Sequence, residues 1–185
     1  MVRAVVLVVI LLAATSAFAQ VENNLVDVSG GYALGSGSGL TANGWYGDVG
    51  IRAHKSLYVV GGVAGLYYST TQVVSGQSVK ATANSYNIGG GPRVFLTRRD
   101  SVVSPFVDVL LSFSHASAEA TNLGTGQQAT VTMNGFGLDI GGGAQFRINK
   151  TFSIRVRPGY SMSRAGGETS SGFLLLSGVV FHFGE

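Results

Sequence analysis

The chain has 185 residues, a formal net charge of +3, only 11% charged residues and no cysteine. This charge balance is too small to indicate a nucleic-acid partner, and the lack of cysteine excludes disulfides and thiolate metal ligands. The ten Phe, seven Tyr and 28 Gly residues are typical of a folded chain rich in strands. A disordered chain would be poor in aromatic residues and rich in charge.

The first 19 residues have the features of a secretory signal peptide. Met1–Arg3 is a positive start, Ala4–Ala14 an apolar run, and Ala17–Ala19 a cleavage motif of small-x-small type. The apolar run is too short for a membrane anchor, which as a helix needs about 20 apolar residues. We therefore predict export, cleavage after Ala19, and one mature domain over residues 20–185.

From about residue 24 onward, eight stretches of alternating apolar and polar residues are joined by connectors that are alternately long and short. The long connectors are rich in Gly, Ser, Thr and Asn and lie at Gly35–Asn43, Ser69–Ala83, Ala116–Ala129 and Arg164–Ser171. The short connectors lie at His54–Ser56, Thr97–Ser101 and Asn149–Thr151. This asymmetry is typical of outer-membrane barrels, which have tight periplasmic turns and longer external loops. We predict an all-β fold, an eight-stranded antiparallel up-and-down transmembrane β-barrel with both ends in the periplasm.

Residue parity assigns the two faces of each predicted strand, because successive side chains point in opposite directions. In residues 140–148, the face that contains Phe146 is apolar and the face that contains Arg147 is polar. Two strands are less regular. Residues 57–68 are apolar on both faces, and the inward set of residues 173–183 includes Leu174, Leu176 and Val180.

The predicted inward face collects four acidic and five basic side chains, namely Asp27, Asp48, Arg52, Arg93, Asp108, Asp139, Arg147, Arg155 and Arg157. An Arg or Lys that faces lipid at mid-membrane costs about 2–4 kcal/mol, which favours the inward orientation. Opposite charges inside a small barrel can pair, and pairing offsets their desolvation. We favour a salt-bridged plug, because eight strands leave an interior only about wide enough for side chains. A polar conduit or gate is the alternative.

Aromatic residues lie near the ends of the predicted strands, where outer-membrane barrels carry aromatic girdles. The predicted girdle residues are Tyr32, Trp45, Tyr58, Tyr67, Tyr68, Phe152, Tyr160, Phe173, Phe181 and Phe183. We expect them to mark the two membrane interfaces.

A glycine-run strand, Gly141–Arg147, is followed by the turn Asn149–Thr151 and the arginine-bearing strand Phe152–Arg157. This hairpin resembles the penultimate hairpin of the small outer-membrane β-barrel family, which includes the outer-membrane protein A barrel and the opacity-type surface proteins. The alternating apolar residues that end in Phe183 are similar to the family's C-terminal assembly signal, although two more residues follow here. The resemblance implies a bacterial outer-membrane location, contact with outer-membrane lipids and lipopolysaccharide, and recognition by the barrel-insertion machinery through the C-terminal strand.

Some eight-stranded outer-membrane barrels modify lipid A, and such an enzyme needs a nucleophile beside a base. His115, Ser117 and Glu119 share one strand face at the outer rim and resemble the His and Ser pair of lipid A 3-O-deacylases. Ala118 stands where that family has an Asn that serves as oxyanion donor. We therefore expect no catalytic residues. The three histidines are scattered without ligand spacing, so we expect no metal site and no cofactor.

These features together predict a structural or surface-interaction role, with the barrel as an anchor for its outer loops. A narrow porin-like channel is the main alternative, with selectivity set by the inward charges. A lipid A-modifying enzyme and a soluble ligand-binding barrel of the lipocalin type are less favoured.

Overall fold

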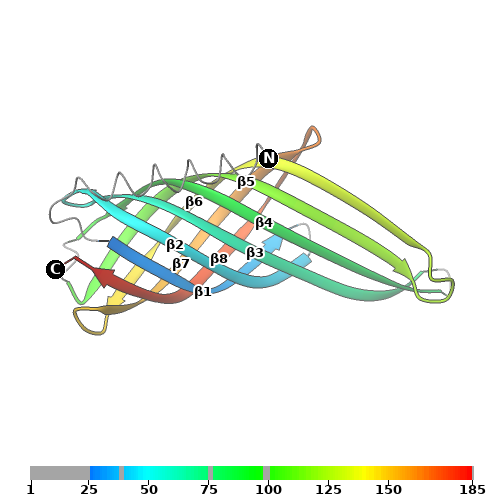
Figure 1. Ribbon diagram of the computed structural model, residues 1–185, viewed down its shortest axis with the longest axis horizontal. Helices are drawn as coiled ribbons and strands as arrows, with labels where there is room; N and C mark the ends of the chain where they lie inside the picture. Colours follow the sequence, from blue (N-terminus) through cyan, green and yellow to red (C-terminus); the bar gives the residue numbers. More distant parts are fainter. Residues whose placement is uncertain (1–25, 38–39, 75–76, 98–100, 185) are drawn as a thin grey trace, which may run out of the picture.

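The computed structural model describes residues 26–37, 40–74, 77–97 and 101–184. The strands are β1 (Val26–Gly37), β2 (Leu40–His54), β3 (Leu57–Val74), β4 (Gln77–Phe95), β5 (Val103–Asn122), β6 (Gln128–Arg147), β7 (Phe152–Ala165) and β8 (Glu168–Phe183). Each strand pairs antiparallel with the next, and β1 pairs with β8, which closes the barrel (Figure 1). The predicted eight-stranded up-and-down barrel is confirmed. The predicted signal peptide, residues 1–19, lies outside the described residues. No helix among the described residues is long and apolar enough to cross a bilayer.

The two ends of the barrel differ as the sequence predicts, but the long connectors are not loops. Most of their residues extend the strands, so that β5 runs to Asn122 and β6 begins at Gln128. The turn between them contains Gly126 with φ 71°, a conformation that glycine adopts without steric cost. The loop prediction rested on the abundance of Ser, Thr and Asn. Thr and Val favour strands wherever a neighbouring strand supplies hydrogen bonds, which explains the difference.

Four of the strands are longer than the rest. β3, β4, β5 and β6 have 18, 19, 20 and 20 residues, whereas the other four have between 12 and 16. Figure 1 shows that these strands continue beyond β1, β2, β7 and β8 at the end opposite the C-terminus. We call this extension the projecting sheet, formed by residues 68–74 of β3, 77–83 of β4, 116–122 of β5 and 128–134 of β6.

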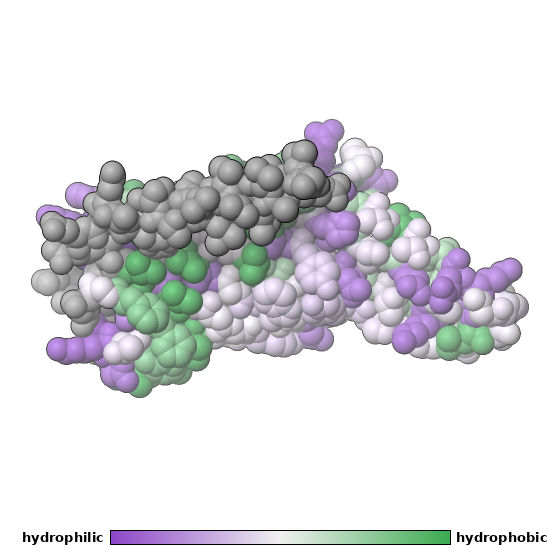
Figure 2. All heavy atoms as spheres, viewed as in Figure 1, coloured by the Kyte–Doolittle hydropathy of each residue, from purple (hydrophilic) through white to green (hydrophobic). Residues whose placement is uncertain are grey.

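The outer face of the barrel carries the apolar side chains, as parity predicts. Val109 and Ile154, which both lie within strands of the wall, are each 42% exposed. At the outer interface, Trp45 Nε1 donates a hydrogen bond to Tyr67 Oη over 3.1 Å, and Tyr67 Oη lies 3.4 Å from Tyr86 Oη. In the view of Figure 2, apolar side chains gather toward the end with the C-terminus, and polar side chains predominate over the projecting sheet.

Two of the predicted girdle residues face the lumen instead. Tyr58 is only 1% exposed, and Tyr68 lines an interior cavity. Both occupy even positions of β3. Gly62 shares their face of the strand and lies opposite the buried Asp48 of β2, which indicates that this face points inward. Aromatic composition near a strand end therefore identified a girdle position only where parity agreed.

The inward apolar residues form two clusters that account for the irregular strands β3 and β8. Tyr58, Val60, Phe95 and Phe106 pack together near the end with the short turns, and the Tyr58 and Phe95 rings are 5.1 Å apart. Ala33, Tyr46 and Leu176 form the second cluster, joined by the partly buried Ala64, Leu66 and Leu174. Strands that are apolar on both faces thus contact lipid outside and these clusters inside.

Candidate functional site in the barrel lumen

Asp108 is the acidic centre of a buried group of charges. Arg93 Nε on β4 donates to Asp108 Oδ2 over 2.9 Å, and Arg157 Nε on β7 donates to Asp108 Oδ1 over 2.8 Å. A second nitrogen of Arg157, Nη2, lies 2.6 Å from the same Oδ1. All three side chains are 2% exposed or less. One carboxylate therefore compensates two guanidinium groups from different strands.

Asp48 connects this pair of arginines to a third. Arg155 Nη1 donates to Asp48 Oδ1 and Oδ2 over 3.0 and 3.1 Å, and Arg93 Nη2 donates to Asp48 Oδ2 over 3.4 Å. Arg155 also donates to Ser29 Oγ and to Gln145 Oε1, each over 3.1 Å. The guanidinium of Arg155 is thus held on several sides, as a buried cation requires.

Asp27 and His182 extend the group toward the end with the short turns. Asp27 Oδ2 lies 3.9 Å from Arg155 Nη2, and Asp27 Oδ1 lies 2.8 Å from His182 Nδ1. His182 Nε2 in turn lies 2.7 Å from Ser153 Oγ. We call these seven buried, mutually connected side chains the charge network; its members are Asp27, Asp48, Asp108, Arg93, Arg155, Arg157 and His182.

Ser153, His182 and Asp27 have the distances of a nucleophilic triad. Ser153 is 0% exposed and Asp27 is 1% exposed. The lumen cavity described below is lined by none of the three residues. The contacts of the three side chains join β7, β8 and β1 in the buried part of the barrel.

The charge network and the first apolar cluster fill the lumen at the same level. Arg93 Cζ lies 4.8 Å from the centre of the Phe106 ring, and Arg155 Cζ lies 5.7 Å from it. Three aspartates face three arginines, so the paired charges balance without a bound ion. In this part of the barrel the charges are buried, paired and packed against aromatic rings.

The other three of the nine charged residues predicted to face inward are half-buried. Arg147 is half-buried at the β6–β7 turn, where its Nε donates to the Asn149 carbonyl over 3.2 Å. Arg52 is half-buried at the end of β2, beside a register shift between Arg52 and His54. Asp139 is half-buried in the outer half of the lumen.

Sequence reasoning did not include His182, Gln145, Ser29 and Ser153 in the network, although each contacts one of its charges. Parity places these residues inside, since each shares its face with an inward residue of its own strand. The missing information is height along the barrel axis, which depends on strand register.

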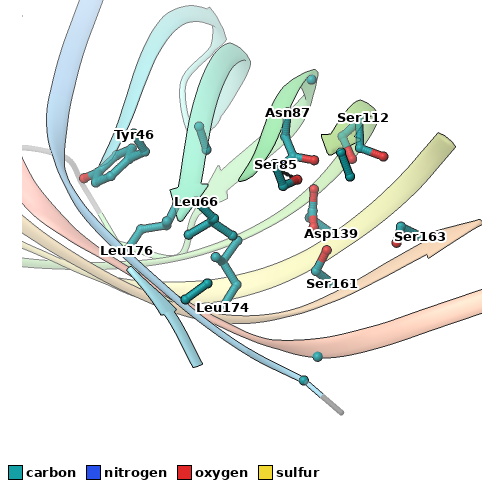
Figure 3. Close-up of a pocket in the computed structure, with 18 of the residues that line it drawn as sticks. Tyr46, Leu66, Ser85, Asn87, Ser112, Asp139, Ser161, Ser163, Leu174 and Leu176 are labelled. Carbon is teal, nitrogen blue, oxygen red and sulfur yellow. Dashed lines mark hydrogen bonds between the residues drawn. The ribbon is translucent and has the colours of Figure 1, made fainter. Parts of the chain in front are cut away.

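The outer half of the lumen is a cavity of about 570 Å³, which we call the lumen cavity. One side carries apolar side chains, and the other carries serines, Asn87 and Asp139 (Figure 3). Arg93, Arg157 and Asp48 contribute to its lining from the charge network, which forms its floor. The lining also reaches Gly37, Ala118 and Ala165 near the outer ends of their strands, so the cavity extends toward the outer mouth.

Of the three residues considered as a catalytic set, Ser117 lines the lumen cavity, whereas His115 and Glu119 do not. His115 Nδ1 lies 2.7 Å from Asn134 Oδ1 across the β5–β6 pair. Glu119 accepts a hydrogen bond from Thr121 over 3.1 Å. Among the described residues, no hydrogen bond joins His115 to Ser117. In the same part of the chain, no cluster of His, Asp or Glu side chains is placed to hold a metal ion.

The sequence matches the family described as outer membrane protein beta-barrel domain over residues 5–183. The chain belongs to this family. Its members are outer-membrane proteins, and the closed barrel with an apolar outer face places this chain in the bacterial outer membrane. Comparison with curated protein sequences finds no match.

Solved outer-membrane proteins share the fold. Ail of Yersinia pestis, in a complex with the heparin analogue sucrose octasulfate, is 19% identical, with a TM-score of 0.63 over 87% of this chain and 99% of Ail. OprG of Pseudomonas aeruginosa is 9% identical, with a TM-score of 0.62 over 89% of this chain and 98% of OprG. Neisserial surface protein A is 20% identical, with a TM-score of 0.54 over 87% of this chain and 97% of that protein.

Proposed function

We propose that this outer-membrane barrel is a closed anchor that presents the projecting sheet to an extended protein segment outside the cell. The observation that carries the proposal is that, among the described residues, neither edge of the projecting sheet has a neighbouring strand. Pairing of β3 with β2 ends at Tyr67, and pairing of β6 with β7 begins only at Gly135. The backbone of residues 68–74 and 128–134 is therefore paired on one side only within the described chain.

The β6 edge has the composition of a strand that accepts a partner. Residues 128–134 read Gln, Ala, Thr, Val, Thr, Met and Asn, and every one of these side chains is exposed. Natural edge strands are protected from pairing by Lys, Pro or a bulge. None of these is present in this segment. An extended peptide that adds a strand would gain main-chain hydrogen bonds here.

The charges outside the membrane favour a neutral partner over a polyanion. The sequence of the four outer connectors contains two basic residues, Lys80 and Arg164, and two acidic residues, Glu119 and Glu168. The structure of Ail includes a heparin analogue. A sulfated polysaccharide is bound by clustered cations, and the outer hairpins of this chain offer no excess of positive charge.

The membrane partners follow from the outer face. Outer-membrane lipids and lipopolysaccharide would contact the apolar belt that includes Val109 and Ile154. The barrel-insertion machinery would read β8, whose outward residues include Phe181 and Phe183, 44% and 53% exposed. The closed lumen disfavours a channel, and the position of His115 disfavours lipid A hydrolysis. Anchoring and binding therefore remain as the supported role.

The exposure of the projecting sheet is tested by labelling single cysteines on intact cells with a membrane-impermeant maleimide. The natural chain has no cysteine, so each label reports one site. We expect Thr132→Cys to react on intact cells. Lys150→Cys, in the β6–β7 turn, should react only after the outer membrane is opened. Equal labelling of Lys150→Cys on intact cells would overturn the orientation.

The edge itself is tested by the adhesion of expressing cells to a panel of immobilised proteins. Thr132→Lys places a charge on the free edge, and Asn84→Lys places the same charge on β4 in the same row of the sheet. We expect Thr132→Lys to abolish adhesion and Asn84→Lys to preserve it. Adhesion that survives Thr132→Lys, or adhesion lost equally in both variants, would contradict strand addition at β6.

A further inference from the structure

The lumen cavity has two walls of different chemistry, which the closed-anchor role does not explain. The apolar wall is formed by Tyr46, Leu66, Leu174 and Leu176 from β2, β3 and β8. The polar wall is formed by β4 to β7 and carries Ser85, Asn87, Ser112, Asp139, Ser161 and Ser163. Figure 3 shows the leucines and Asp139 on different sides of the cavity.

Asp139 is the unpaired acid of the lumen. Within the described chain, no hydrogen bond or ion pair reaches its carboxylate, and it is half-buried. Arg157, a cation of the cavity floor, is already bound to Asp108 through Nε and Nη2. Since the aspartates and arginines of the charge network balance each other, Asp139 leaves the outer half of the lumen with an excess negative charge.

The register of the wall places two serines beside Asp139. Ser161 lies directly opposite Asp139 in the β6–β7 pair. Ser112 Oγ occupies the space above Gly137, since a Cβ added to Gly137 would lie only 2.6 Å from this oxygen. Gly137 is the next inward position of β6 beyond Asp139, so the glycine leaves space for this hydroxyl beside the carboxylate. A cation here would meet one charge and two neutral oxygen acceptors.

We propose that the lumen cavity binds an amphipathic organic cation, a primary amine with an apolar aromatic or alicyclic body. The ammonium group contacts the Asp139 carboxylate and the Ser161 and Ser112 hydroxyls. The apolar body lies against Leu66, Leu174 and Leu176. Specific pockets combine a mainly apolar wall with a few placed polar groups, and they have volumes of about 300–1,000 Å³. The lumen cavity, at about 570 Å³, is within this range.

The cation reaches the site from the outer mouth and stops at the charge network. The cavity lining extends outward to Ala118 and Ala165, whereas Arg93 and Arg157 lie on its floor. The carboxylates of Asp48 and Asp108 at the floor are already paired with arginines, so a cation that moves deeper finds no free carboxylate there. The site is therefore a binding cup and does not continue into a passage through the barrel.

The test is binding of 3-phenylpropylammonium to the full barrel in lipid nanodiscs, followed by the methyl resonances of labelled leucines. The uncharged 3-phenylpropan-1-ol serves as the matched ligand, and empty nanodiscs report partition into lipid. We expect saturable shifts of Leu66, Leu174 and Leu176 with the amine. Asp139→Asn should weaken amine binding by about tenfold or more and leave alcohol binding unchanged, because it removes only the charge.

Two further variants test whether the apolar wall contributes to binding and whether a carboxylate at the outer rim does. Leu66→Ser should weaken both ligands, since it removes apolar contact area. Glu119→Gln removes a carboxylate at the outer rim and should change neither affinity. Leucine shifts that do not saturate, or an equal effect of Asp139→Asn on amine and alcohol, would overturn the proposal. These outcomes are independent of the adhesion assay, because Thr132 does not line the cavity.

Discussion

Asp108 and Arg157 form a buried ion pair although their strands, β5 and β7, are not neighbours in the barrel wall. The intervening strand β6 presents Gly141 between them, opposite Asp108 on one side and Gly159 on the other. A Cβ at Gly141 would lie 2.5 Å from Arg157 Cζ. The glycine of the wall is therefore what allows the arginine to lie across β6 and reach the aspartate.

The first prediction concerns this glycine. Gly141→Ala should displace the Arg157 guanidinium and destabilise the barrel by about 1–3 kcal/mol, the usual cost of overpacking. The matched control is Gly61→Ala, since a Cβ there meets nothing within 4 Å. Unfolding in urea from phospholipid vesicles measures both variants. Equal stability of Gly141→Ala and the natural protein would show that Arg157 does not depend on the space above Gly141.

The second prediction compares two aspartates of the lumen. Asp108→Asn leaves two buried arginines without their shared carboxylate and should cost about 3–5 kcal/mol. Asp139→Asn removes the same charge from a side chain that forms no ion pair with any described residue, and its effect should stay within about 0.5 kcal/mol. The free energy of unfolding of each variant, compared with that of the natural protein, measures the two losses. If the two losses are similar, the stabilising role of the charge network is wrong.

The third prediction concerns the outward face. Val109→Arg places a charge toward lipid in the middle of the wall and should destabilise the barrel by about 2–4 kcal/mol. Val131→Arg, at a 57% exposed position of the projecting sheet, should have little effect on stability. Refolding yield and unfolding in vesicles give the comparison. A tolerated arginine at Val109 would place that position in water.

The fourth prediction uses the single tryptophan. Trp45 lies at the outer interface, where its indole donates to Tyr67, and aromatic belts lie at headgroup depth. Its fluorescence should be quenched more strongly by lipids brominated near the headgroup than by lipids brominated near the chain end. Maximal quenching by the deep bromines would move Trp45 to the bilayer centre and invalidate the girdle.

Much of the barrel followed from residue parity and connector composition, because one face of every strand meets lipid. Parity separated Val109 from Asp108 and Ile154 from Arg155. It did not show the extent of the strands, since a chain rich in Ser and Thr forms either a loop or a hairpin according to its neighbours.

The lumen was less predictable, since its contacts depend on register. The sequence placed Asp108 and Asp139 on the same inward face, yet one lies in the charge network and the other in the cavity. The two aspartates differ in their height along the barrel axis. The height of a residue is set by the register of all the strand pairs around the barrel. The contact of His182 with Asp27 likewise depends on the closure of β8 on β1.

Single-channel current across planar bilayers tests most directly whether the barrel is closed. The charge network and the first apolar cluster, which contains Phe106, occupy the lumen below the lumen cavity, so the purified natural protein should give no discrete openings at any applied potential that the bilayer tolerates. Asp108→Asn provides the comparison, since loss of the shared carboxylate loosens the plug. Stepwise, reproducible openings of the natural protein would contradict a closed anchor and establish a channel.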